Sequence, residues 1–172
     1  ETVTLYTTVY NDGSEDATAV NVSFYDGPDL IGSVIIPTLS AGDSQQVSMN
    51  WVAVEGVRTL WVRVDPQNTI QEFAEKNNNI SKEVPVTWVV SGYEHYSGQT
   101  FYVANISVEN SGTLILENCT LIFQTRSWID LYMWVSGGLG LYNTTVAAED
   151  TNYRYSIAID RGGGAEVMNT VI

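Results

Sequence analysis

Apolar and polar residues alternate with a period of two along most of the chain. Residues 20–24 place Val, Val and Phe on one side with Asn and Ser on the other, and residues 60–64 repeat the arrangement with Leu, Val and Val. Such alternation is typical of a β-strand with one buried face. Stretches rich in Asn, Asp, Gly and Pro separate these segments, as turns would. The helix-like stretch at residues 70–76 is followed by three Asn residues and is interpreted as a turn-rich connection. We therefore predict an all-β fold.

The spacing of the predicted strands changes near Pro85. Before it, turn signals recur about every 8–12 residues, which is the rhythm of an antiparallel β-sandwich. After it, a Gly-containing turn followed by apolar residues and an Asn occurs three times, and Asn118, Asn143 and Asn169 lie 25 and 26 residues apart. This repeat length is typical of a parallel β-helix, whose coils bury their inner faces only by stacking. The predicted organisation is an Ig-like antiparallel sandwich over residues 1–87, a linker over 88–97 and β-helix repeats, incomplete at the C-terminus, over 98–172.

The composition argues against several functional classes. The 172 residues include 20 acidic and 7 basic side chains, a formal net charge of −13. Nucleic-acid and anionic-membrane surfaces need clustered basic residues, so neither partner is expected. One Cys and one His argue against an internal disulfide, a thiolate zinc site and a conventional catalytic triad. No apolar run approaches the roughly 18 residues of a membrane span. We expect no enzymatic activity.

The first half of the chain closely resembles the CARDB family, the cell-adhesion-related domain of bacterial and archaeal surface proteins. The residues that carry the resemblance are Val9–Gly13, Ala19–Gly27, Ile31–Ser33, Leu39–Gly42, Trp51, Asp65–Glu72 and Glu75–Asn78. The resemblance implies an Ig-like β-sandwich that serves as a non-catalytic module of large secreted and cell-surface proteins. The sequence departs from the family in one respect, because the family normally has a further strand before the one expected over residues 2–10.

The second half resembles the right-handed parallel β-helix repeats that accompany such modules in archaeal and bacterial surface proteins. Residues 105–118 carry this resemblance. Some relatives of that fold bind or degrade polysaccharides, so the fold alone does not settle function. A sandwich without its first strand and a β-helix that stops within a coil would expose backbone groups and apolar core. We expect the ends to be covered by a longer chain or by another copy, through strand complementation or end-to-end stacking.

Five Asn-x-Ser/Thr sequons make N-glycosylation a candidate modification. They begin at Asn21, Asn79, Asn105, Asn118 and Asn143. Alternation places Asn21 and Asn105 on outward faces, and Asn79 lies in an Asn-rich loop. Asn118 and Asn143 have a second possible role, because equivalent Asn side chains in successive coils can form a hydrogen-bonded ladder. A ladder and an attached glycan are mutually exclusive uses of one amide.

Three aromatic residues, Trp128, Tyr132 and Trp134, are candidates for a contact surface. Alternation places them on one side, where they could contact another subunit, stack on sugars or pack beneath a loop. His95 has no second His or Cys nearby in the sequence and is interpreted as a surface or junction residue. Cys119 lies within a predicted strand and is expected to be a buried thiol.

The acidic residues suggest structural turns more than chemistry. Asp65, Asn68, Glu72 and Glu75 could offer calcium the oxygen ligands it requires. Their spacing is not that of an EF-hand loop, and Asp and Asn in a Pro-containing turn commonly bond the backbone. We therefore predict no cofactor, with calcium as the alternative. Acidic pairs such as Asp26 with Asp29 lie in predicted turns and are interpreted as solvated charge.

Together these features predict a non-catalytic structural or adhesive module of an extracellular, cell-surface protein. Its expected partners are other copies of itself or of the same surface assembly, such as a filament, sheath or surface layer, and possible glycans. The alternative is a carbohydrate-binding accessory region of a secreted polysaccharide-active enzyme.

Overall fold

The computed structural model describes residues 1–72 and 74–172, and the side chains of all of these except Glu75. Regular structure in this part of the chain is almost entirely β, apart from a short 3-10 helix, η1 (Glu75–Asn77). The chain divides into two compact units. The first comprises Glu1–Val54 and Arg58–Val84, and the second comprises Glu55–Val57 and Pro85–Ile172.

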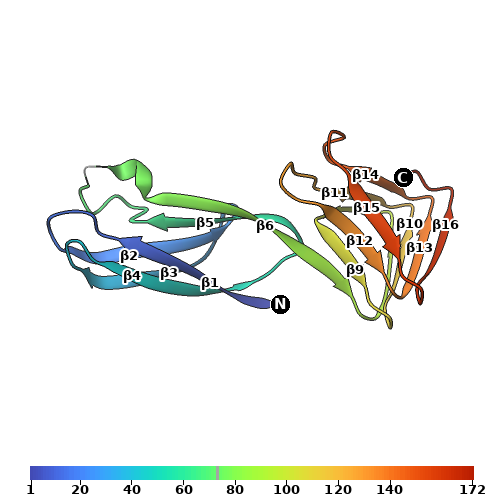
Figure 1. The fold of residues 1–172 in the computed structure, drawn as a ribbon, viewed down its shortest axis with the longest axis horizontal. Helices are drawn as coiled ribbons and strands as arrows, with labels where there is room; N and C mark the ends of the chain where they lie inside the picture. Colours follow the sequence, from blue (N-terminus) through green and yellow to red (C-terminus); the bar gives the residue numbers. More distant parts are fainter. Residues whose placement is uncertain (73) are drawn as a thin grey trace. The chain divides into compact units, whose positions relative to one another are not determined.

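The first unit is a β-sandwich with two layers of unequal size (Figure 1). One layer pairs β1 (Thr2–Tyr10) with β4 (Ser44–Val52) in antiparallel fashion. The other has the order β3-β2-β5-β6, formed by β3 (Asp29–Leu39), β2 (Ala17–Asp26), β5 (Gly56–Val64) and β6 (Asn79–Val90). Val22, Phe24 and Ile36 are fully buried between the layers. The alternation at residues 20–24 and 60–64 therefore corresponds to strands of one sheet.

The second unit is a solenoid whose coils pair in parallel (Figure 1). Its first sheet contains β7 (Tyr93–Ser97), β10 (Thr113–Glu117), β13 (Gly138–Tyr142) and β16 (Gly164–Met168). Its second sheet contains β8 (Thr100–Val103), β11 (Thr120–Phe123) and β14 (Thr145–Ala148). Its third sheet contains the end of β6, β9 (Asn105–Val108), β12 (Leu131–Val135) and β15 (Tyr155–Ile159). The predicted all-β fold, with a parallel solenoid after an Ig-like sandwich, is confirmed.

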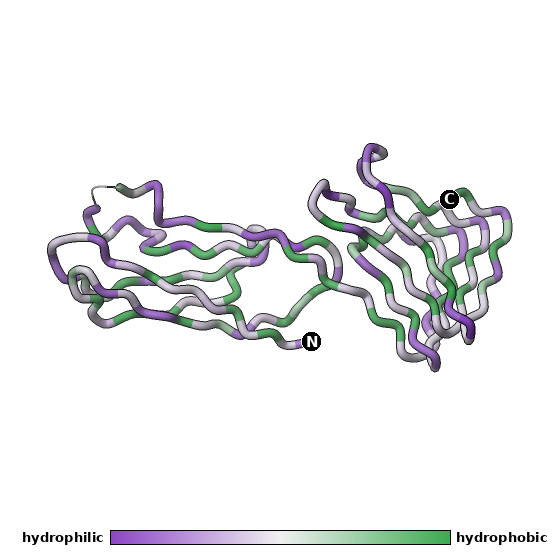
Figure 2. Tube along the Cα trace, in the orientation of Figure 1, coloured by the Kyte–Doolittle hydropathy of each residue, from purple (hydrophilic) through white to green (hydrophobic). Residues whose placement is uncertain are grey.

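The repeat found in the sequence is one coil of this solenoid. Leu114 pairs with Leu139 of the next coil, and Leu139 pairs with Ala165 of the one after. Inward positions alternate with outward ones along each strand, and the tube in Figure 2 changes between hydrophobic and hydrophilic accordingly. Leu116, Leu141 and other inward side chains are fully buried. The coils thus build one continuous apolar core.

Glycines open the repeats because the coils approach closely at that corner. A Cβ placed on Gly112 would overlap the carbonyl group of Val90 in the preceding coil. A Cβ placed on Gly137 would overlap the carbonyl oxygens of Glu109 and Gly112. Only a residue without a side chain fits there, which explains why Gly marks the start of each repeat.

Residues 88–97 differ from the predicted linker. The end of β6 pairs in parallel with β9, and β7 pairs in parallel with β10, so these residues form the first coil. The inward positions of β7 are Glu94 and Tyr96, which pair with Leu114 and Leu116. These positions lack the aliphatic residues of the later coils, so the sequence pattern predicted a linker over residues 88–97.

Among the described residues of the stretch 70–76, Glu75 and Lys76 begin η1 and the others are in no regular element. Phe73 and the side chain of Glu75 lie outside the described residues. In the part of the chain that is described, no helix has the length and apolar character needed to span a membrane.

Candidate functional site: the coils and open end of the solenoid

One corner of every coil adopts the left-handed backbone conformation. Gly98, Asn118, Asn143 and Asn169 each follow a strand of the first sheet, with φ values of 68°, 52°, 49° and 49°. Gly and Asn reach this region at the lowest cost. The regular spacing of the Asn residues therefore serves the backbone. Within the described residues, the exposed Asn side chains form no hydrogen-bonded ladder, which corrects that interpretation of Asn118 and Asn143.

The residue after each Asn forms the ladder instead, and it points inward. Thr144 is 1 % exposed, and its hydroxyl lies 3.0 Å from the carbonyl oxygen of Leu116 and 3.1 Å from that of Tyr142. Thr170 repeats the arrangement one coil later, 3.1 Å from the carbonyl oxygen of Leu141. These hydroxyls add hydrogen bonds between successive coils at the corner where the strands end.

Cys119 holds the same place in the coil before Thr144. Its thiol is buried and free, and Sγ lies 3.2 Å from the carbonyl oxygen of Glu117. Its backbone N–H donates to Oγ1 of Thr144 at 3.4 Å. The buried thiol predicted from the sequence is confirmed, and it acts as a weak substitute for the hydroxyl of the next coils.

The five sequons fall into two groups by exposure. Asn79, Asn118 and Asn143 have exposed side chains. Asn118 and Asn143 project from the left-handed corners, where the amide is directed away from the core and remains accessible.

The other two sequon residues are engaged in the fold. Asn105 is buried, and its Oδ1 accepts the backbone N–H of Tyr132 at 3.1 Å, joining β9 to β12. Asn21 is half-buried and donates from Nδ2 to Oε1 of Gln67 at 3.0 Å. The outward face predicted for Asn105 does not give an accessible amide, because a neighbouring strand uses it.

The end of the solenoid formed by the first coil is closed by aromatic side chains. The rings of Trp88, Tyr96 and Phe101 lie 5.1–5.7 Å apart between centroids and pack on the apolar core. Glu94 accepts hydrogen bonds from Nε1 of Trp88 at 3.1 Å and from the hydroxyl of Tyr96 at 3.2 Å. Burial, with the nearby Glu94 charge, raises the pKa of Tyr96. This carboxylate thereby satisfies the polar atoms of the aromatic cap.

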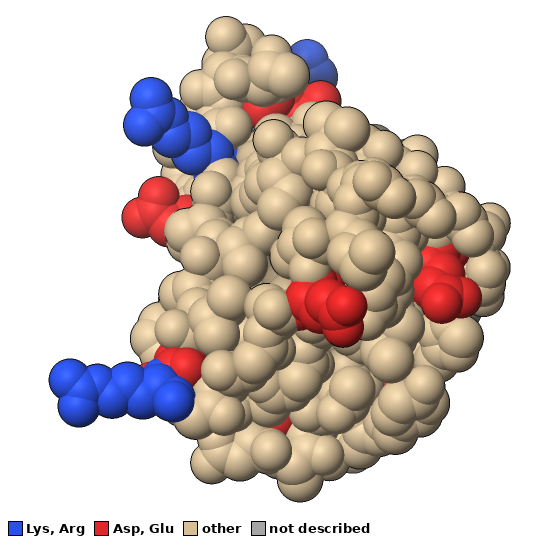
Figure 3. Space-filling model, turned by 90° about the vertical axis from the view of Figure 1, so that its right-hand side faces the viewer, with Lys and Arg blue, Asp and Glu red and all other residues tan. Residues whose placement is uncertain are grey.

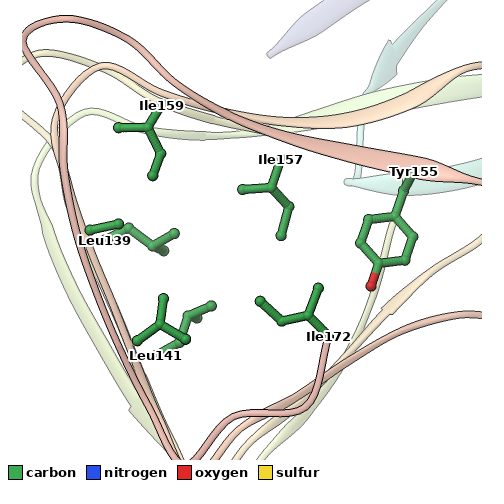
Figure 4. A pocket seen from close by; sticks show the side chains of 8 residues that line it. Leu139, Leu141, Tyr155, Ile157, Ile159 and Ile172 are labelled. Atoms are coloured by element: carbon green, nitrogen blue, oxygen red, sulfur yellow. The ribbon is translucent and has the colours of Figure 1, made fainter.

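The opposite end of the solenoid is an open apolar hollow of about 410 Å³ (Figure 4). Side chains from β13 and β15 point toward one another across it, as the labelled Leu139, Leu141, Ile157 and Ile159 show. Val167 on β16 completes the lining and is 47 % exposed. These side chains occupy the inward positions that a further coil covers elsewhere. The molecular face drawn in Figure 3 is also largely uncharged, with few acidic or basic groups.

The three candidate aromatic residues are exposed. Tyr132 and Trp134 occupy the two outward positions of β12 and are 40 % and 45 % exposed, and Trp128 in the preceding loop is 52 % exposed. Trp134 is flanked in the sheet by Ser107 and Ala158, which are small. The interpretation that these rings pack beneath a loop is therefore wrong, and they form part of an outer face.

The candidate calcium ligands lie in a turn that uses the carboxylate itself. Asp65 is buried, and it accepts hydrogen bonds from the hydroxyl of Thr69 at 2.7 Å and the N–H of Ile70 at 2.6 Å. Burial alone would raise the pKa of Asp65, but these hydrogen bonds outweigh it and lower the pKa. Asp65 and Asn68 both have positive φ. No cluster of three metal-ligating side chains occurs among the described residues, from which the Glu75 side chain is excluded.

Two further side chains have structural contacts. His95 lies on the outward face of β7, with Nε2 3.2 Å from Oε2 of Glu117, in agreement with the expected surface position. Asp26 accepts hydrogen bonds from Arg58 at 3.0 Å and from Nε1 of Trp51 at 3.2 Å. Asp26 is buried, so it is not the solvated charge that the sequence predicted.

Replacement of Thr144 by Val should destabilise the solenoid by about 1–3 kcal/mol, because the buried hydroxyl that bonds the carbonyl oxygen of Leu116 and accepts the N–H of Cys119 is lost while the side-chain shape is kept. Equilibrium urea unfolding followed by tryptophan fluorescence measures the change. Thr145→Val is the matched control, since Thr145 is exposed on the next strand, and it should alter stability by less than about 0.5 kcal/mol. Equal effects of the two variants would contradict the role assigned to the inner hydroxyl.

Comparison with known proteins identifies the first unit. Residues 1–82 match the family model of the CARDB domain. No curated protein matches the chain. One similar solved structure is a Pyrococcus furiosus CARDB domain crystallised in complex with di-metal ions. It is 23% identical to this chain with a TM-score of 0.46, and the matched region covers 49% of this chain and 73% of that one.

Two other solved structures are similar to the same region. A domain of a Methanosarcina acetivorans protein, provisionally named as a cell surface protein, is 30% identical over 45% of this chain and 70% of its own, with a TM-score of 0.42. A Geobacter metallireducens protein is 27% identical over 50% of this chain and 81% of its own, with a TM-score of 0.42. Residues 1–82 are a CARDB domain, and a parallel β-solenoid follows it in the same chain.

Proposed function

We propose that this chain is a structural module of an extracellular cell-surface protein, and that residues 1–172 self-associate through the apolar hollow lined by β13, β15 and β16. CARDB is a non-catalytic domain type, and a similar domain belongs to the Methanosarcina acetivorans protein provisionally named as a cell surface protein. The low content of basic residues and the all-β architecture agree with a scaffold.

The observation that supports association is the contrast between the two ends of the solenoid. The first coil is closed by Trp88, Tyr96 and Phe101, whose polar atoms are satisfied by Glu94. The coil that contains β15 and β16 instead presents an apolar hollow lined by side chains such as Leu139, Leu141 and Val167. Contiguous exposed apolar surface of this kind marks an interaction site. A second copy that presents the same end provides a matching uncharged surface, and the contact is then two-fold symmetric.

Replacement of Val167 by Glu should abolish this association, because a carboxylate would be buried without a partner in the joined hollow. Sedimentation velocity over a range of concentrations should show dimers for the native chain and at least about tenfold weaker association for the variant, a loss of roughly 1.4 kcal/mol or more. Met168→Glu is the control, since Met168 follows on the same strand, is 51 % exposed and does not line the hollow. A native chain that stays monomeric, or equal effects of both variants, would refute the proposal.

We further propose that the accessible sequons carry glycans on the natively produced protein. The exposed amides of Asn79, Asn118 and Asn143 support this, whereas Asn105 is occupied by its hydrogen bond to β12. Mass spectrometry of tryptic and chymotryptic peptides should find glycan mass on the Asn143 peptide and none on the Asn105 peptide. Thr145→Val removes the Asn143 sequon while it keeps the Asn that the corner needs. Unmodified Asn143 in native material would contradict the assignment.

A second candidate function, carbohydrate binding, rests on the exposed outer face of β12. Tyr132 and Trp134 lie two residues apart on one strand and have small neighbours on the flanking strands, so both rings can be reached by a planar ligand. Sugars bind such aromatic faces through their apolar C–H surfaces, and hydroxyl groups nearby add orientation. Neutral polysaccharides fit this surface better than charged ones, since the rings carry no formal charge.

Trp134→Ala should weaken retention by an immobilised neutral polysaccharide, such as xylan or mannan, by about tenfold, which corresponds to roughly 1.4 kcal/mol. Affinity electrophoresis in gels that contain the polysaccharide gives the dissociation constant. Tyr102→Ala is the control, because Tyr102 is 56 % exposed but lies on β8 in another sheet. If the native chain is not retarded by any neutral polysaccharide, this second function is excluded.

A further inference from the structure

One arginine of the sandwich lies on aromatic rings instead of beside an acidic group. Val62 and Val64 of β5 pack on the core, so Arg63 between them points to the outer face of the larger layer. Its guanidinium carbon lies 4.9 Å from the ring centroid of Tyr25 and 5.6 Å from that of Trp61. Tyr25 on β2 and Trp61 on β5 are paired directly across the two strands (Figure 1). The two rings therefore support one guanidinium, and these three residues are named the arginine platform.

The nitrogen atoms of this guanidinium have no partner within the described part of the chain. Nε of Arg63 is buried and forms no hydrogen bond with any described residue. Its two Nη atoms form no hydrogen bond or ion pair with these residues either, and they are not buried. By contrast, Arg58 on the same strand bonds the carboxylate of Asp26 at 3.0 Å. Because aromatic stacking holds a guanidinium without using its N–H groups, the edge formed by the two Nη atoms is available to a ligand.

The available edge of the guanidinium favours an anion that has two oxygen atoms in one plane. Two parallel N–H groups can then donate to two acceptors, which is the geometry of an arginine–carboxylate pair. One carboxylate also balances the single positive charge of Arg63. The 20 acidic side chains of the chain repel anions at long range, but salt at physiological ionic strength screens this repulsion beyond about 8 Å. A carboxylate ligand is therefore bound through local contacts.

The face beside the arginine platform offers contacts that suit a sugar ring. Leu30 on β3 pairs with Tyr25 and is exposed, so it extends the apolar surface of the rings. Ser33 on β3 is also exposed, and its hydroxyl lies 2.8 Å from that of Ser23, which pairs with Arg63 on the other side. A pyranose ring has apolar C–H faces and hydroxyl groups, and it binds surfaces that combine apolar and polar groups. A uronic acid residue adds a carboxylate to such a ring.

We propose that the arginine platform binds the carboxylate of a uronic acid residue in an acidic polysaccharide. Arg63 donates hydrogen bonds from its two Nη atoms to the carboxylate, while Tyr25 and Trp61 hold the guanidinium in place. The sugar ring lies beside the platform, where Leu30 contacts its C–H face and the hydroxyl of Ser33 bonds its hydroxyl groups. This site belongs to the sandwich, and it is independent of the solenoid hollow and of the neutral-polysaccharide surface proposed on β12.

The experiment titrates the full chain with oligogalacturonate at physiological ionic strength and follows the Nε–H signal of Arg63 by proton–nitrogen correlation NMR. This proton is suited to the measurement because Nε is buried. We expect a saturable shift of the signal as the carboxylate binds the neighbouring Nη atoms. An Arg63 signal that does not move up to the solubility limit of the oligomer would overturn the proposal.

Two further probes separate the carboxylate from the sugar ring. The fully methyl-esterified oligomer keeps the rings without the charge and should bind at least about tenfold more weakly. Oligoglutamate keeps the carboxylates without the rings and should also bind at least about tenfold more weakly. Equal affinity for the methyl ester would contradict the role given to Arg63. Equal affinity for oligoglutamate would replace the polysaccharide with an acidic peptide as the occupant.

Two variants locate the binding surface. Arg63→Lys keeps the positive charge but loses the planar pair of donors, so affinity for oligogalacturonate should fall at least about tenfold. Leu30→Glu leaves Arg63 in place and adds a like charge beside the ligand, so affinity should fall by a similar factor. Arg161→Lys is the matched control, because Arg161 is an exposed arginine of the solenoid, and it should bind as the native chain does. Backbone amide signals of β2 and β5 report binding and the intact fold in every variant.

The variants also distinguish this site from the others. Native affinity in Arg63→Lys, or an equal loss in Arg161→Lys, would show that the oligomer does not occupy the arginine platform. Trp134→Ala and Val167→Glu should both bind oligogalacturonate as the native chain does, because they alter only the outer face of β12 and the solenoid hollow. A failure of the arginine platform is therefore separable from a failure of either function proposed for the solenoid.

Discussion

The stacking of coils is the interaction on which the solenoid depends. A single coil has an apolar inner face and no opposite layer to cover it, so its side chains become buried only when coils lie on both sides. Leu116 and Leu141 occupy one such row and are fully inaccessible. Complete burial of an aliphatic side chain contributes about 1.5–3 kcal/mol. The burial of each inner row of side chains therefore depends on the adjacent coils. The strands pair in parallel because every coil repeats the path of the one before.

The corners determine whether such stacking is possible. Close approach requires glycine at Gly112 and Gly137, where a side chain would overlap carbonyl groups of the neighbouring coil. The left-handed corners accept Gly98 and then Asn at equivalent positions. Thr144 and Thr170 follow those corners, and each hydroxyl bonds a carbonyl oxygen of the preceding coil and one of its own coil. In each repeated Asn-Thr pair, Asn adopts the left-handed backbone conformation and Thr forms hydrogen bonds between coils.

Sequence patterns predict the parts of this fold in which a residue position has a single structural role, such as the buried face of a strand. Period-two alternation predicted the strands that contain Phe24 and Val62, and the spacing of Asn118 and Asn143 matched the coil length. The structure adds that Phe24 and Val62 pair in one sheet. The first coil was missed because its inward residues, Glu94 and Tyr96, close an end instead of filling a core. The sequence also did not reveal that the repeated Asn residues adopt the left-handed backbone conformation. A regular spacing of Asn is expected both for such corners and for a ladder of hydrogen-bonded side chains. The accessibility of Trp134 and Asn105 depends on neighbours that are distant in sequence.

The two ends of the solenoid differ in how their apolar core is covered. At the first coil, three aromatic rings and one carboxylate end the apolar core and leave its polar atoms paired. Addition of a coil there would separate Glu94 from Trp88 and bury a charge without its partners, which costs several kcal/mol. At the coil of β15 and β16 the hollow is lined mostly by aliphatic side chains, with Leu139 and Ile157 pointing into it, and the hydroxyl of Tyr155 is bonded to the carbonyl oxygen of Val146 at 3.1 Å. A layer placed over these side chains gains the hydrophobic free energy of the hollow, whereas a layer placed over the first coil would have to disrupt the hydrogen bonds of Glu94.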